Sequence, residues 1–465
     1  MATIGEDGDV HAVVAVPCMK DELNVFAPPK MDTSASSGTF VELHPVSVVS
    51  GSQPTEFFDP GSNEQFTDLT ETRLTMTLGV TKSDGTALEA DTDTVAPINN
   101  VLHSVFSRIE VQFNDVDVTS PTAHYAYRAY VQNLLNYSLE EKTSHLTGQG
   151  YHLDDNLHSI GPNPPDITKE DPKNPATPLV TKRDRNSGLQ SRFEMVKAGV
   201  FQYSAPVVCD VFNIEKYMLP GVSMRMKLTR SNDAFALMCG KPDPNQYKVI
   251  IKDVRLRLYK IIPTSSYRLG IEDALAVRNA AYHYTRSDTK TMTIEKSSIS
   301  FYQDNLFPGV LPKRMTVGLV SSTAFSGSYK ENPYFFHHYN MSRIAVEIDG
   351  RAVPYQAIKT DFSSNAYVEA YDALVNAGGC YNTDVGNGIS MNDYKKGFTL
   401  LCFDLTSDKS AGAGDYLHPE VRGNLSLELN FRQELPHQVT LFILTEHAGR
   451  IIIDGNRAVT ATHSD

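Results

Sequence analysis

Alternating apolar and polar residues near position 100 predict a strand, a turn and a helix in succession. In residues 108–113 (RIEVQF) every second side chain is apolar, the period that places these side chains on one face of a strand. Asn114-Asp115 follows as a hairpin-turn signal. Apolar residues then recur at spacings of three and four from Tyr127 to Leu135, which predicts one face of a short helix lying on the sheet.

The same series recurs in the second half of the chain. Ser107-Arg108-Ile109 returns 235 residues later as Ser342-Arg343-Ile344, again followed by a turn signal, Asp349-Gly350. Ala126-Tyr127 returns 240 residues later as Ala366-Tyr367. Two further matches keep the same order and join residues 73–76 to 314–317 and residues 221–226 to 423–429. This shared order at a nearly constant offset favours a duplicated unit over a chance alignment of alternating strands.

Short β runs separated by turn residues extend over most of the chain, a pattern typical of β-sandwiches. The strands predicted in the first half are residues 40–49, 72–80, 105–113, 201–212, 222–230 and 247–262. The strands predicted in the second half are residues 290–301, 312–320, 337–349, 397–405, 423–431 and 437–447. We therefore predict an all-β protein of two tandem sandwiches with the same topology, each with a short helix in the same connection.

The segments outside these strands divide the chain further. Residues 1–38 have no periodicity that could pack in a core and are predicted to form an N-terminal arm, which is either disordered or ordered by a neighbouring subunit through arm swapping. The first sandwich, residues 39–263, carries a long insertion at 140–189 whose proline-rich middle excludes a central strand or helix. We interpret this insertion as a projecting functional loop, with a mobile surface loop as the alternative. The remaining predicted divisions are a helical linker at 264–289, the second sandwich at 290–454 and a C-terminal tail at 455–465.

Composition and charge narrow the range of functions. The formal net charge of −13 disfavours direct binding to a nucleic-acid backbone, which depends on clustered Lys and Arg. The five cysteines are scattered without a CxxC pair, which indicates a reducing compartment, and Cys209 and Cys402 are interpreted as buried strand residues. The first residues carry acids where a signal peptide needs bases, and no stretch approaches ~20 apolar residues, so we expect no membrane span.

No motif predicts a catalytic, cofactor or metal site. The adjacent pair His337-His338 would point to opposite faces of a regular strand, so the two rings are not expected to share a metal. The other histidines are interpreted as satisfied or exposed. The acidic pairs Glu140-Glu141 and Asp154-Asp155 are interpreted as solvated charges. Glu110 and Glu347 suggest the paired carboxylates of a glycosidase, but we interpret them as outward-facing residues of two different copies.

Tyrosine-rich segments allow two interpretations. Tyr125, Tyr127, Tyr130 and Tyr137, together with residues 334–338, suit an interface between subunits, since aromatic residues favour interfaces. Packing in the core under each sheet is the competing use. We favour the core for the duplicated pair, Tyr127 and Tyr367.

Several segments, spread over most of the chain, match one known family. They are DELNVFAPP (21–29), VELHPVSVVS (41–50), APINNVLHSVFSRIEVQFNDVDVTSPTAHYAYRAYVQNLLNYS (96–138), YMLPGVSMRMKLTRSNDAFALM (217–238), residues 300–340, GFTLLCFDLT (397–406) and RGNLSLELNFRQELP (422–436). In these segments the chain resembles the double jelly-roll major capsid proteins (hexons) of Polinton/Maverick-type elements, the adintovirus and virophage-like group.

This resemblance implies both an architecture and a role. Each half is expected to be an eight-stranded jelly roll. Three chains would form a pseudo-hexameric homotrimer that tiles an icosahedral shell around a double-stranded DNA genome, without enzymatic activity. The implied partners are copies of the chain itself, neighbouring capsomers and a penton or minor capsid protein, with no sequence-specific nucleic acid. The implied location is the virion capsid after synthesis in the host cytoplasm, and assembly in the nucleus or the cytoplasm stays open. The insertion at 140–189 would form an outer tower or a contact between capsomers.

Two other functions stay open at this point. One is a duplicated β-sandwich carbohydrate-binding protein or hydrolase, which needs a cleft lined by aromatic residues and carboxylates. The absence of tryptophan from the chain counts against a sugar-binding platform. The other is a captured cellular gene that retains only the capsid fold.

Overall fold

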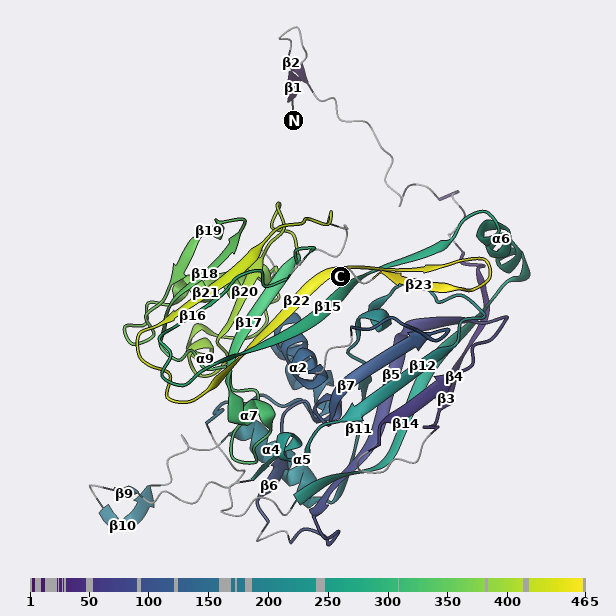
Figure 1. Ribbon diagram of the computed structural model, residues 1–465. Helices are drawn as coiled ribbons and strands as arrows, with labels where there is room; N and C mark the ends of the chain where they lie inside the picture. The colour runs from purple at the N-terminus through teal and green to yellow at the C-terminus, as the bar shows by residue number, and fades with distance from the viewer. Residues whose placement is uncertain are drawn as a thin grey trace.

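The computed structural model contains two β-sandwiches that lie side by side (Figure 1). The residues that the structure describes are 31–46, 53–89, 93–120, 124–158, 186–239, 247–307, 309–380, 384–412 and 418–462, with short pieces at 2–4, 10–12, 23, 25–26, 28, 169–171 and 174–179. No helix within these ranges is long and apolar enough to cross a membrane.

The first sandwich consists of two four-stranded antiparallel sheets. Its strands are β3 (Ala35–Leu43), β4 (Thr55–Asp59), β5 (Phe66–Lys82), β7 (Phe106–Phe113), β8 (Val116–Asp117), β11 (Val200–Pro206), β12 (Met224–Arg230) and β14 (Tyr247–Pro263). One sheet has the order β11-β5-β14-β3 and the other has the order β4-β12-β7-β8. Leu74, Met76 and Leu78 alternate along β5 and are buried, because successive strand residues point to opposite faces of the sheet.

The second sandwich repeats this arrangement with one added strand. Its strands are β15 (Ala280–Ile294), β16 (Ser300–Gln303), β17 (Arg314–Ser321), β18 (Met341–Ile348), β19 (Arg351–Lys359), β20 (Leu400–Asp404), β21 (Leu425–Phe431), β22 (Val439–Ile453) and β23 (Val459–Thr462). One sheet has the order β15-β22-β17-β20, with β23 also paired to β22, and the other has the order β16-β21-β18-β19.

Strand order confirms the duplication that the sequence predicts. Taken in chain order, β3, β4, β5, β7, β8, β11, β12 and β14 occupy the same sheet positions as β15 to β22. The repeated sequence pairs therefore lie in equivalent strands, since β7 corresponds to β18, β5 to β17 and β12 to β21. The chain is an all-β protein of two tandem sandwiches that share one eight-strand order, as predicted, and the second sandwich adds β23 to it.

Short helices and minor strands lie in the connections. The helices are α1 (Val101–Ser104), α2 (Tyr125–Asn136), α3 (Leu139–Thr143), η2 (His145–Gln149), α4 (Ser187–Lys197), η4 (Asp210–Asn213), α5 (Asp233–Ala236), α6 (Ser265–Leu275), α7 (Ser322–Ser326), α8 (Val368–Ala377) and α9 (Met391–Lys395). The minor strands are β1 (Ala2–Ile4), β2 (Val10–Ala12), β6 (Val95–Pro97), β9 (Lys169–Asp171), β10 (Asn174–Leu179) and β13 (Leu237–Cys239). Helices α2 and α8 follow β8 and β19, so each copy has its helix in the same connection, as predicted.

Two predicted boundaries are wrong. The helical linker predicted at 264–289 is helical only through Leu275, because β15 begins at Ala280 and pairs in continuous register with β22. The tail predicted at 455–465 contains β23, which pairs with β22 and buries Val459. In the predicted linker, long-range strand pairing overrides the local helix propensity. The predicted arm, 1–38, overlaps the start of β3 at Ala35.

The predicted insertion at 140–189 is only partly an excursion. Its first part packs into the body, where Leu146, Tyr151 and Leu157 are buried. The buried amine of Lys142 donates to the carbonyl oxygens of Leu134, at 2.6 Å, and Asn387, so this segment also binds the second sandwich. Strands β9 and β10 pair only with each other in the structure as described, and most of the proline-rich middle lies outside the described residues.

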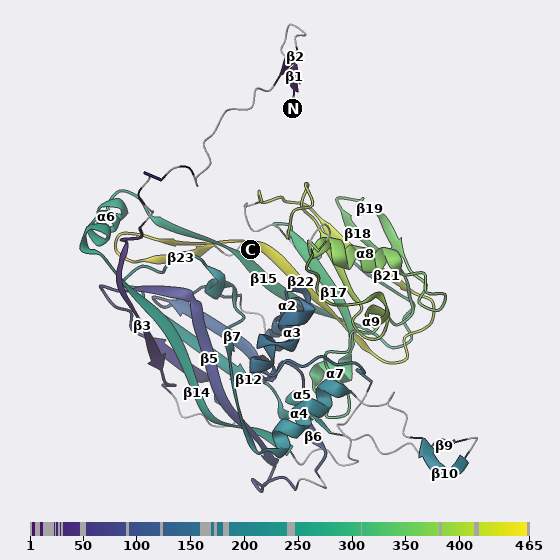
Figure 2. The ribbon, with the colours of Figure 1, turned by 180° about the vertical axis from the view of Figure 1, so that it is seen from behind.

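Each sandwich contributes residues to the core of the other. Figure 2 shows α2 between the two bodies, with β15 and β22 continuing toward the corner that carries α6. Tyr284 of β15, Ile453 of β22 and Val459 of β23 are buried in the core of the first sandwich. Tyr130 of α2 and Phe193 of α4 are buried in the core of the second. The two sandwiches therefore share buried apolar surface, and we expect them to unfold as one cooperative unit.

The tyrosine-rich segments lie inside this shared core. The rings of Tyr130 and Tyr334 are fully buried and stack in parallel with centroids 3.9 Å apart. Tyr125 is also buried, so of the two interpretations core packing holds for these three residues and a subunit interface does not. Core packing is confirmed for the duplicated pair, Tyr127 and Tyr367.

Candidate functional site

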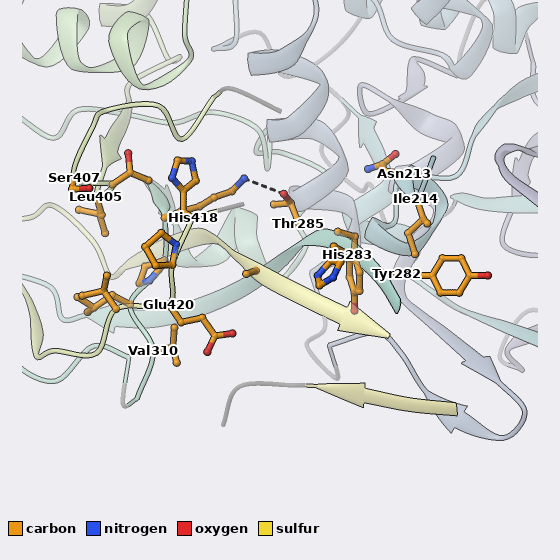
Figure 3. Close-up of a pocket in the computed structure, with 18 of the residues that line it drawn as sticks. Asn213, Ile214, Tyr282, His283, Thr285, Val310, Leu405, Ser407, His418 and Glu420 are labelled. Atoms are coloured by element: carbon orange, nitrogen blue, oxygen red, sulfur yellow. Dashed lines mark hydrogen bonds between the residues drawn. The ribbon is translucent and has the colours of Figure 1, made fainter. Parts of the chain in front are cut away.

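A cleft of about 540 Å³ lies where the two sandwiches meet (Figure 3). The first sandwich contributes residues 213–216, at the end of η4 and just after it. The second contributes residues 282–285 of β15 and the loops at 310–313, 405–407 and 418–421. Neither sandwich alone forms this cleft.

Lys313 is the most buried cation in the cleft lining. Its amine donates to the Thr285 hydroxyl at 3.0 Å, the contact drawn as a dashed line in Figure 3. Burial lowers the pKa of Lys313. His418 and Glu420 line the cleft from the loop at 418–421, and His418 Nε2 lies 3.3 Å from the Ser410 carbonyl oxygen. The lining combines apolar side chains with a few polar groups, the composition of a surface that binds a chain segment or small ligand.

A second groove, of about 740 Å³, lies beneath α6 and continues from the cleft. The two hollows share Glu215, Lys216 and Tyr282. The groove is lined mainly by apolar side chains, which are Phe66, Leu219, Ile261, Pro263, Ile271, Ala274, Leu275, Ala280 and Ala281, with Tyr217, Tyr267 and Tyr282. Its edge also includes Ser34 and Ala35, where the N-terminal arm joins β3.

Helix α6 leaves much of its apolar surface in solvent. Leu275 is its buried residue, whereas Tyr267 and Leu269 are exposed, as is Val277 just after the helix. Clustered exposed apolar side chains mark interaction surfaces more often than scattered ones do. The α6 corner is therefore the strongest candidate contact surface on the described part of the chain.

The adjacent histidines depart from the predicted geometry. His337 and His338 precede β18 instead of lying in it, and their rings stack with centroids 4.4 Å apart, so the prediction of opposite faces is wrong. His337 Nδ1 accepts the Tyr339 N–H at 2.9 Å, and His338 Nδ1 accepts the Asn340 N–H at 3.0 Å. Tyr339 and Asn340 both have positive φ, so the two neutral rings stabilise a turn in the left-handed region.

Burial, together with neighbouring His158 and His437, lowers the pKa of His337 to about 4. Burial, together with His337 and Lys395, lowers the pKa of His338 to about 3. The folded protein therefore disfavours the protonated rings. The two neutral rings contribute folding stability that is fully present above ~6.5, the pKa of histidine in the unfolded chain. This stability is lost as the pH falls from ~6.5 toward the lowered pKa values of the folded protein.

Acidification is accordingly expected to lower the thermal midpoint between pH 6.5 and pH 4.5. A His337→Asn/His338→Asn variant retains a side-chain acceptor for each turn N–H but does not titrate in this range. Its midpoint should vary less with pH than that of the wild type, as measured by thermal denaturation across a pH series. Parallel pH dependences of the two proteins would exclude this role for the histidine pair.

The acidic pairs differ from one another in the structure. Glu141 caps α3 by accepting the Ser138 N–H at 2.7 Å, and Glu140 is exposed. Asp154 is not solvated as predicted, because its side chain is fully buried and forms an ion pair with Arg192 at 3.0 Å. The neighbouring Asp155 is exposed, as predicted. Sequence reasoning missed the Asp154 pair, since Arg192 lies 38 residues away and neither residue belongs to a recognisable motif.

The remaining candidate residues occupy structural positions. Glu110 lies on β7 and pairs with Arg108 at 2.7 Å and Lys227 at 3.4 Å, whereas Glu347 lies on β18 of the other sandwich. Cys209 and Cys402 are buried, as predicted, and burial raises the pKa of Cys402 to about 11. Among the described residues, no group of three or more His, Cys, Asp or Glu side chains is placed to hold a metal ion.

Comparison with known sequences finds similarity to a nematode protein. No family model matches the chain. An uncharacterized protein of Caenorhabditis elegans is 25% identical over 393 residues, which cover 82% of this chain and 87% of that protein.

Solved structures identify the fold. A chain of the Sputnik virophage has a TM-score of 0.58 at 12% identity and matches 98% of this chain and 94% of its own length. The Faustovirus major capsid protein has a TM-score of 0.56 at 9% identity, with 94% and 92% covered. The mavirus major capsid protein has a TM-score of 0.51 at 10% identity, with 98% and 96% covered. The chain has the double jelly-roll fold that these viral capsid proteins share.

Proposed function

We propose that this chain is a major capsid protein, encoded by a virus or by a Polinton-type element of the adintovirus and virophage-like group. Three copies form a pseudo-hexameric capsomer, and the capsomers tile an icosahedral shell around a double-stranded DNA genome. A separate penton or minor capsid protein closes the vertices. The role is structural and not enzymatic, and the protein is made in the host cytoplasm and resides in the virion.

The observation that carries this proposal is the identical strand order of the two sandwiches. Three chains with two equivalent sandwiches each present six similar bodies around one threefold axis, so a trimer can fill a hexagonal position in a closed shell. The shared core supports it further, because rigidly joined sandwiches keep the spacing that tiling requires.

Charge and exposed surface agree with an assembly role. The net charge of −13 suits a shell that encloses DNA without sequence-specific contacts to it. The exposed apolar residues at the α6 corner suit burial against another copy. Obligate interfaces typically bury more than ~2,000 Å² in total, so a trimer should be stable at low concentration.

Size-exclusion chromatography with light scattering tests this function. We expect a species of three times the chain mass of 51.4 kDa, or larger particles, and hexagonal outlines in negative-stain electron micrographs. A monomer that binds oligosaccharides would instead support the carbohydrate-binding alternative. A monomer without such binding would favour a captured gene that retains only the fold.

A further inference from the structure

The N-terminal arm carries apolar side chains that its own body leaves uncovered. Leu23, Val25 and Phe26 are 69%, 75% and 94% exposed. Exposed apolar side chains that lie together mark an interaction site more often than single ones do. The groove beneath α6 is the apolar hollow at the root of this arm, since Ser34 lies on its edge.

We propose that the arm segment around Leu23–Phe26 of one copy occupies the groove beneath α6 of a second copy. The inference rests on the proposed trimer and names the contact that closes it. Each copy donates its arm to one neighbour and receives an arm from the other. Because this head-to-tail contact repeats around a threefold axis, it closes into a ring.

The groove offers a strand edge as well as an apolar lining. Among the described strands, β15 pairs only with β22, so its other edge is open along the groove at Ala280–Tyr282. An extended segment can add to such an edge through main-chain hydrogen bonds while alternate side chains enter the hollow. In the single chain Leu23 lies in a 3-10 turn and Val25 and Phe26 in a turn, so docking extends this segment. Once it is extended, Leu23 and Val25 fall on the same face.

Charge and reach agree with this occupant. Asp21 and Glu22 directly precede Leu23 in the sequence, and Lys216 and Arg278 line the groove beside Glu215. The chain from Val25 to Ser34 spans up to ~30 Å when extended, enough to cross a subunit boundary. The exposure of Leu23, Val25 and Phe26 in the single chain favours the groove of a neighbour over the chain's own groove.

Cross-linking tests the contact directly. In a Cys18→Ser/Cys380→Ser background, which leaves only the buried native cysteines, Val25→Cys is combined with Ala274→Cys in the groove lining and treated with a short bismaleimide. The expected products on a reducing, denaturing gel are covalent dimers and trimers. The matched control combines Val25→Cys with Val368→Cys on α8, a site that is 56% exposed but distant from the groove, and should stay monomeric. Cross-links confined to single chains, or equal yields from both pairs, would overturn the proposal.

A second variant measures the strength of the contact. Replacing Leu23, Val25 and Phe26 with serine should raise the trimer dissociation constant ~100-fold or more, since three buried apolar side chains are lost. The thermal midpoint of the dissociated monomer should not change, because these residues are exposed in the single chain. An unchanged dissociation constant would contradict the proposal.

Light scattering on the wild-type protein distinguishes a failure of the proposed arm exchange from a failure of the proposed capsid function. A trimer that gives no cross-link between chains would leave the capsid proposal standing and refute the arm exchange. A wild-type monomer would refute both.

Discussion

Replacing Tyr334 with alanine is expected to destabilise the protein by about 3–5 kcal/mol, the cost typical of removing a large buried aromatic side chain. Tyr334 is fully buried and stacks on Tyr130 of α2, so the change leaves a cavity between the two sandwiches. Its hydroxyl also lies 2.5 Å from Ser104 Oγ and donates to the Ala126 carbonyl oxygen at 3.3 Å. Thermal and chemical denaturation followed by circular dichroism would measure the loss.

Two control variants separate the contributions of the Tyr334 ring and hydroxyl. Tyr334→Phe keeps the stacked ring and removes only the hydroxyl contacts, so it should cost ~1 kcal/mol. Tyr302→Ala removes an aromatic side chain that is largely exposed and should change stability by less than ~0.5 kcal/mol. If Tyr334→Ala resembled Tyr302→Ala, the aromatic stack would not hold the sandwiches together.

Replacing Asp154 with alanine is the second change with a large expected effect, a loss of about 3–5 kcal/mol. The change leaves the Arg192 guanidinium fully buried without its carboxylate partner. Arg192 would retain its bond from Nε to the Pro97 carbonyl oxygen, at 2.9 Å, which does not neutralise its charge. Asn99 would lose its 3.0 Å bond to the same carboxylate. Chemical denaturation would measure the shift in the unfolding midpoint.

The matched control removes both charges. An Asp154→Leu/Arg192→Met variant leaves no uncompensated charge, so it should be more stable than Asp154→Ala despite carrying two substitutions. Asp155→Ala removes the exposed neighbouring carboxylate, which accepts the Ser187 N–H at 2.8 Å, and should cost ~1 kcal/mol. A double variant as unstable as Asp154→Ala would show that packing, and not the unpaired charge, sets the cost.

Of the candidate contact surface, the sequence pattern identifies the apolar arm segment but not the groove beneath α6. The segment around Leu23–Phe26 is apolar yet flanked by turn and polar residues, so it is recognisable as an arm. The groove beneath α6 is not recognisable in this way, because its lining comes from the arm root, β5, residues 215–219, the end of β14, α6 and β15. Residues from such distant segments have no common spacing in the sequence.

The sequence by itself determined the fold class, the duplication and most strand positions. The reason is that the apolar period of two is a local signal that each strand carries alone, and two copies in the same order repeat it. The equivalence of β7 with β18 could therefore be deduced from Ser107-Arg108-Ile109 and Ser342-Arg343-Ile344.

Only the tertiary structure decided which side chains are shared between the two halves. Residues 280–289 lie next to a helix-favouring segment, and their strand forms because β22 supplies a partner about 160 residues later. Asp154 and Asp155 look alike in the sequence, and the docking of α4 buries only the first. Burial depends on contacts between segments far apart in the chain, and a local pattern does not contain that information.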